Sequence, residues 1–264
     1  MRSLIARNTC NHNTRMDNSW RSAHVAIAAG ADTVINYPLW IVAKRMGAGL
    51  PAFPPLRRLY SGGGALWVSM APTTVIEDGV TTGLRRFAES ELLCAAASGV
   101  AAALLCTSQI EHVITAAHAR GDGVAATARR VLRDRGAAGL LLPPGMAAMA
   151  CREIPFAAAL FAGRPRIAAE AERRFGPAAT PGARVAKEVA CGAAAAAVGG
   201  PVSHAPSVVA AYQQATNAPL AKAIGAIYAA GGGRAFFRGL PARTLSLAGT
   251  FAVVPYVLDL LAPA

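Results

Sequence analysis

Six apolar segments of roughly membrane-spanning length alternate with basic clusters along the chain. Apart from Asp32 in the first, these segments contain no Asp, Glu, Lys or Arg, and they cover residues 23–43, 59–76, 92–110, 136–151, 189–221 and 244–258. A charged side chain at the centre of a lipid-facing helix costs a few kcal/mol, and about 20 apolar residues cross the hydrocarbon core as a helix. The pattern therefore predicts an all-α bundle of six transmembrane helices.

The composition favours this membrane bundle over its alternative, a soluble helical protein rich in alanine. Only 15% of the 264 residues are charged, against about 25% in an ordinary soluble domain. The 54% of hydrophobic residues also excludes a disordered chain, which lacks the apolar side chains needed to build a core.

The charge that remains is mostly positive, with 26 Lys and Arg against 14 Asp and Glu. We assign the arginines to loops, the cluster Arg234–Arg243 among them, and place only Arg152 inside a span. Loop arginines beside a bilayer bind anionic lipid headgroups, for example those of cardiolipin. Because no aromatic side chains form a stacking platform among them, we expect no nucleic-acid partner.

The sequence shows no motif for catalysis or for binding a metal or cofactor. The five cysteines form no C-x-x-C pair, and the histidines lack the spacing of metal ligands. The glycine runs at 62–64 and 231–233 are followed by no G-K-[ST], so they do not indicate a phosphate loop. We expect neither an enzyme nor a metal or cofactor site.

Two sets of motifs alternate along the chain and divide it into three helix–loop–helix repeats. In one set, a glycine precedes a second Pro or Gly by ten residues: Gly62 and Pro72, Gly145 and Pro155, Gly239 and Gly249. In the other, a proline or glutamine lies late in an apolar segment: Pro38, Gln109 and Pro206. The predicted repeats cover 21–88, 89–176 and 185–264. The first has the shortest loop, with three prolines at 50–56, and is expected to lack the surface helix of the other two.

Residues 1–20 precede the first repeat. They contain three arginines and no acid before Asp17. This pattern is typical of an organelle-targeting segment, and a frayed tail is the alternative.

The arrangement resembles the mitochondrial carrier family over about residues 20–262. The resemblance is carried by Tyr37-Pro38-Leu39, by Arg152-Glu153-Ile154-Pro155-Phe156 and by GGGRAFFRGLPAR at 231–243. It implies six transmembrane helices around a pseudo-threefold axis, a monomer and a solute site at mid-membrane. By default it also implies the mitochondrial inner membrane, with other organelle membranes as alternatives. Proline kinks a helix, so kinks are expected at Pro38, Pro72, Pro155 and Pro206.

The resemblance further implies ion pairs that close the two mouths of a funnel, yet most of the family's charges are replaced here. Trp40 stands at the first acid position and Glu111 at the second, and Lys44 follows the first base position. On the opposite side, Asp259 is the one matching acid. We therefore expect a gate formed by packing around Trp40 and by a contact between Glu111 and Lys44.

Substrate contacts of the family lie seven residues after the repeat glycines, which implies Ser69, Arg152 with Glu153, and Ser246. Asp32 adds an acid on the first span. An ionisable pair inside a span indicates a functional site, and an arginine beside an acid suits a zwitterion such as an amino acid. The short first repeat, the acid on the first span and the phrase Arg-Glu-x-Pro-Phe together also resemble S-adenosylmethionine carriers. The alternative is that the pair only locks its helix against a neighbour.

These observations predict a transporter that moves a small charged or zwitterionic metabolite by alternating access. Its expected partners are that small-molecule solute and the membrane lipid. The missing gate charges motivate the alternative, a degenerate carrier-fold membrane adaptor without transport activity.

Overall fold

The computed structural model describes residues 18–88 and 90–261, which form helices joined by turns and loops, with no strand among them. The predicted tail lies almost wholly outside this part of the chain. In order, the elements are α2 (Asn18–Gly47), the 3₁₀ turn η1 (Leu56–Arg58), α3 (Gly63–Leu84), α4 (Glu91–Ala102), the π-helix η2 (Ala103–Thr107), α5 (Ser108–Arg120), α6 (Val124–Leu141), α7 (Met146–Ala157), the π-helix η3 (Ala158–Gly163), α8 (Arg164–Phe175), α9 (Pro181–Thr216), α10 (Leu220–Ala229), the 3₁₀ turn η4 (Gly232–Phe237) and α11 (Leu240–Leu261).

Five helical segments in the described ranges are long and apolar enough to cross a membrane. They are Ala26–Gly47, Glu91–Arg120, Met146–Phe175, Pro181–Thr216 and Gly232–Leu261. The α3 helix has 22 residues, but the acids at 77 and 78 interrupt its apolar sequence. The predicted all-α class is confirmed, and the long apolar helices are consistent with a multi-pass membrane protein.

The fourth span differs from the predicted segment 136–151. Residues 136–141 belong to α6, and the long apolar helix runs instead from Met146 to Phe175 through α7, η3 and α8. The arginines of α8, which we expected in a loop, are therefore helical. Glu170 forms ion pairs with Arg173 and Arg174 at spacings of three and four residues, which stabilises a helix that carries many charges.

The contacts between the long helices form a closed ring. Going round it, α2 packs against α3, α3 against α4, α4 against α7, α7 against α9 and α9 against α11, and α11 packs back against α2. Small residues permit the closest of these contacts. A Cβ atom on Gly192 of α9 would lie 2.9 Å from the backbone carbonyl oxygen of Ala248 on α11.

In each predicted repeat, one glycine directly precedes the second helix, and the three glycines have the same backbone conformation. Gly62, Gly145 and Gly239 precede α3, α7 and α11 with φ values of 94°, 88° and 82°. Only glycine adopts this left-handed region routinely, which explains why the sequence places glycine at these three turns.

A side chain of the preceding long helix contacts the same backbone position in two of these turns. The Tyr37 hydroxyl of α2 donates a hydrogen bond to the carbonyl of Ser61, the residue before Gly62. His204 of α9 places its Nε2 atom 2.9 Å from the carbonyl oxygen of Arg238, the residue before Gly239. The first and third pairs of long helices are thus joined in the same way.

The prolines at which we expected kinks lie inside helices and do not end them. Pro38, Pro72, Pro155 and Pro206 belong to α2, α3, α7 and α9, and each helix continues past its proline. At the equivalent position of the second repeat, Gln109 follows the π-helix η2. Its Nε2 atom donates to the carbonyl of Leu104 within that π-helix, at 2.7 Å.

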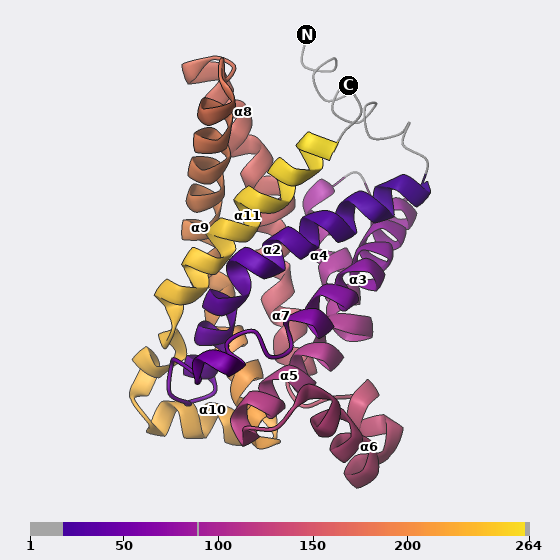
Figure 1. Cartoon of the computed structure of the whole chain (residues 1–264), viewed down its shortest axis with the longest axis vertical. Coiled ribbons are helices and arrows are strands. Elements are labelled where there is room, and N and C mark those ends of the chain that lie inside the picture. The colour runs from indigo at the N-terminus through magenta and orange to yellow at the C-terminus, as the bar shows by residue number, and fades with distance from the viewer. Residues whose placement is uncertain (1–17, 89, 262–264) are drawn as a thin grey trace.

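The loops also follow the predicted asymmetry. The second loop contains α6 and the third contains α10, at the same end of the bundle (Figure 1), while the first contains only the three-residue turn η1. The expectation of a first loop without a surface helix is therefore confirmed.

Replacing Gly145 by alanine should destabilise the bundle. A left-handed backbone costs a residue with a Cβ about 1–2 kcal/mol, and this Cβ would lie 3.0 Å from the carbonyl oxygen of Ala210 on α9. We expect Gly145→Ala to lower the melting temperature of the detergent-solubilised protein. Gly79→Ala is the control, because nothing lies within 4 Å of its Cβ position inside α3. Equal melting temperatures for the two variants would contradict the assignment.

Candidate functional site

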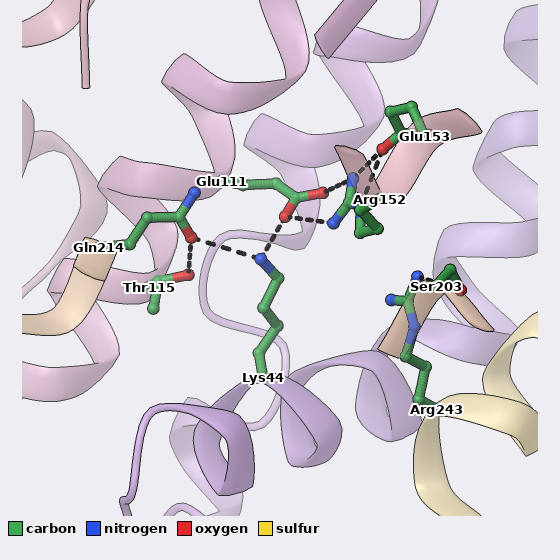
Figure 2. A network of polar contacts seen from close by, with 8 residues as sticks. All are labelled: Lys44, Glu111, Thr115, Arg152, Glu153, Ser203, Gln214 and Arg243. Carbon is green, nitrogen blue, oxygen red and sulfur yellow. Dashed lines mark hydrogen bonds and ion pairs between the residues drawn. The ribbon is translucent and has the colours of Figure 1, made fainter. Parts of the chain in front are cut away.

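Four charged side chains meet inside the bundle. Lys44 comes from α2, Glu111 from α5, and Arg152 and Glu153 from α7 (Figure 2). None is more than 7% exposed. Charges this deeply buried are tolerated only when they are paired and hydrogen-bonded, so their mutual contacts determine how the three helices can pack.

Glu111 lies at the centre of the cluster and binds a cation from each neighbouring helix. Arg152 donates to it bidentately, from Nη1 to Oε2 at 2.9 Å and from Nη2 to Oε1 at 3.0 Å. Lys44 forms an ion pair with the same Oε2 atom. The contact that we expected between Glu111 and Lys44 is therefore present, and Arg152 joins it.

Local sequence brings these side chains to the same level of the bundle. Lys44 lies in the last turn of α2, where the helix dipole favours a cation. Glu111 lies inside the continuous helical segment Glu91–Arg120. Glu153 follows Arg152 on α7 and accepts a hydrogen bond from its Nε atom at 2.8 Å. The arginine thus bridges two carboxylates.

A fourth helix joins the cluster through an amide. Gln214, near the end of α9, accepts hydrogen bonds on its Oε1 atom from Lys44 Nζ at 3.3 Å and from Thr115 Oγ1 at 3.2 Å. The cluster consequently ties together α2, α5, α7 and α9 (Figure 2). We call these six residues the interhelix cluster: Lys44, Glu111, Thr115, Arg152, Glu153 and Gln214.

Two further predicted residues lie beside this cluster. Trp40 stacks on Tyr37 with ring centroids 5.4 Å apart, and Lys44 Nζ lies 5.5 Å from the centre of a Trp40 ring. Ser246 on α11 is 4% exposed and lines a small cavity together with Trp40 and Lys44. The structure thus brings most of the predicted gate and site residues to one level.

Three other predicted residues, Ser69, Asp32 and Asp259, have their polar contacts outside the interhelix cluster. Ser69 donates to the carbonyl of Leu66 in its own helix at 2.6 Å. Asp32 accepts a hydrogen bond from Asn36 at 2.6 Å.

Asp259 lies at the other end of the bundle, where it pairs with Arg184 at 3.1 Å. Both side chains of this pair are more than half exposed. Asp259 therefore joins α11 to the beginning of α9, far along that helix from Gln214.

The position of Arg243 differs from our expectation. We had placed Arg243 in a loop and expected Arg152 to be the one arginine inside a span. Arg243 lies on α11, is only 6% exposed, and donates from Nη2 to Ser203 Oγ of α9 at 3.3 Å. We missed it because it ends an arginine-rich run. Its position three residues before Ser246 was the available signal, because that spacing places both on one helix face. Gln214 and Thr115 were also missed and carry no motif.

The part of the chain that is described gathers no group of three or more His, Cys, Asp or Glu side chains that could hold a metal ion. The interhelix cluster instead consists of ion pairs between helices, which can break and form again. The sequence matches no protein-family model, and no curated protein is significantly similar to it.

Removing the charge of Glu111 should destabilise the protein far more than removing that of Asp259. Glu111→Gln leaves two buried cations without their shared carboxylate, and breaking a buried pair costs about 3–5 kcal/mol. Asp259→Asn breaks an exposed pair, which is worth about 0–1 kcal/mol. The measurement is the free energy of unfolding in mixed micelles titrated with dodecyl sulfate. Similar losses for the two variants would show that the interhelix cluster does not hold the helices together.

Proposed function

We propose that this chain is a transmembrane transporter that moves a small charged or zwitterionic metabolite by alternating access. The observation that carries the proposal is the interhelix cluster, a set of buried charges whose contacts run between helices. Such contacts hold one end of the bundle closed and release it when they exchange partners. An amino acid or S-adenosylmethionine is the candidate solute that the sequence resemblance suggests.

The architecture proposed for this transporter is six transmembrane helices in three repeats, as in mitochondrial carriers. The ring of long helices supports it, because each helix packs against its neighbours in chain order. The three left-handed glycines before α3, α7 and α11 also support it. The matching contacts of Tyr37 and His204 with the residue before a repeat glycine agree with two of the three repeats.

In this proposal the two ends of the bundle close in different ways. The interhelix cluster closes the end where α2, α5 and α9 finish. At the other end, Arg184 pairs with Asp259, and Arg164 of α8 pairs with Glu188 of α9 and donates to the carbonyl of Phe251 at 2.8 Å. Alternating access requires that the contacts at one end break while those at the other form.

Arg152 and Glu153 have two roles in the cycle that we propose. With the interhelix cluster intact, the arginine holds Glu111. Once that contact breaks, its planar guanidinium becomes free to bind a carboxylate in the same bidentate manner, and Glu153 becomes free to bind a cationic group. Breaking the contact thus couples solute binding to opening.

One observation favours the alternative, a carrier-fold adaptor without transport. Arg152 uses Nε, Nη1 and Nη2 for Glu111 and Glu153, so its hydrogen bonds are satisfied within the chain. A helix lock that never opens would show the same contacts. Transport activity is the property that separates the two functions.

The proposed location is the mitochondrial inner membrane, which follows from the resemblance alone. A monomer in contact with anionic lipid headgroups is the proposed state. The exposed arginines outside the long apolar helices, such as Arg57, are suited to those headgroups.

Uptake by the purified protein in liposomes tests the proposal. Liposomes loaded with unlabelled amino acids or S-adenosylmethionine should accumulate the matching radiolabelled solute, and Arg152→Ala should abolish this accumulation. Arg133→Ala is the matched control, because it removes an exposed arginine of α6 that pairs, among the described residues, only with its neighbour Asp134 and should leave most of the uptake. Absence of uptake for every solute in the panel would refute transport and support the adaptor.

A further inference from the structure

Arg243 is a buried cation without an acidic partner among the described residues. The residue is 6% exposed, and its one hydrogen bond among the described residues goes to the neutral hydroxyl of Ser203. The Nε atom of Arg243 has no hydrogen-bond partner in the described structure. Figure 2 shows Arg243 apart from the interhelix cluster, with no contact to either carboxylate.

The charges near this position do not balance. Besides Glu77 of α3, a partly buried acid near Glu153, two carboxylates, Glu111 and Glu153, are buried with the three cations Lys44, Arg152 and Arg243. Both carboxylates are engaged by Lys44 and Arg152. Because an unpaired buried charge is strongly unfavourable, Arg243 is suited to an anion that arrives from outside the chain.

A small cavity lies in front of Arg243. Its volume of about 20 Å³ is enclosed by residues of α2, α9 and α11, with Trp40, Lys44, His204, Ser207, Arg243 and Ser246 among them. A cavity needs about 10–15 Å³ by this measure to hold one water molecule, so only a small polar group fits.

We propose that Arg243 and Ser246 bind the carboxylate group of the transported solute. A guanidinium holds a planar carboxylate with two parallel hydrogen bonds, and Ser246 provides a hydroxyl donor one helical turn away. The small volume favours a carboxylate over the larger tetrahedral phosphate. This inference rests on the proposed transport function and deepens it: the solute carries a carboxylate, and Arg243 is its first anchor while Glu111 still occupies Arg152.

Binding can be measured without transport, using sodium acetate as the probe. The melting temperature of the purified full-length protein in detergent is followed as acetate replaces chloride at constant ionic strength. Because a ligand stabilises the folded state that binds it, we expect the melting temperature of the wild type to rise with acetate concentration. The rise should be lost in Arg243→Gln and kept in Arg133→Gln, the exposed-arginine control.

The melting temperatures without acetate provide a second readout. Arg243→Gln should melt at or above the wild-type temperature, because it removes an uncompensated buried charge. A variant that fails to fold, or that melts well below the wild type, would show that Arg243 is structural and would overturn the proposal. An acetate response that is absent from the wild type or unchanged in Arg243→Gln would also overturn it, as would a response to phosphate at the same ionic strength in place of acetate.

The two proposals can fail separately. An acetate response that depends on Arg243, without uptake of any solute, would support the anion site and refute transport. Uptake together with an acetate response that is independent of Arg243 would refute the anion site and support transport.

Discussion

The carboxylate of Glu111 is the constraint on which the packing of α2, α5 and α7 against one another depends. It binds Arg152 with two hydrogen bonds and forms an ion pair with Lys44, so it fixes α5 against α7 and α2 at once. Without it, two cations would remain in an interior with no other carboxylate to compensate both. The same interaction can therefore act as a lock or as a gate, and the difference lies in whether a solute can compete for its partners.

Much of the fold could be predicted from the sequence because a membrane restricts charge so strongly. The apolar segments located the helices around residues 23–43, 92–110 and 244–258, and the repeat glycines marked turns that require a left-handed backbone. The fourth segment was misplaced because the loop before α7 is also free of charge. The helix α8 was missed because we took its charged run for a loop. The helical spacing of its ion pairs was the signal that we did not use.

The candidate site was predictable only in part, for a physical reason. Counting from the repeat glycines located Arg152, Glu153 and Ser246, and the order of the motifs suggested the contact between Glu111 and Lys44. Partners contributed by distant helices, such as Gln214, follow from the way the bundle packs and leave no local pattern. Whether an arginine at the end of a basic run is buried depends on where its helix begins, so Arg243 could not be separated from its loop neighbours.

The central claim, that the interhelix cluster closes one end of the bundle, is tested most directly by thiol labelling. Thr115 is 2% exposed and contacts Gln214 within the cluster, and Thr115→Cys can be introduced into a chain whose own cysteines are replaced by serine. A charged, membrane-impermeant methanethiosulfonate should label this cysteine slowly while Glu111 is present and markedly faster when Glu111→Gln is added. Equal labelling rates with and without Glu111 would contradict the account.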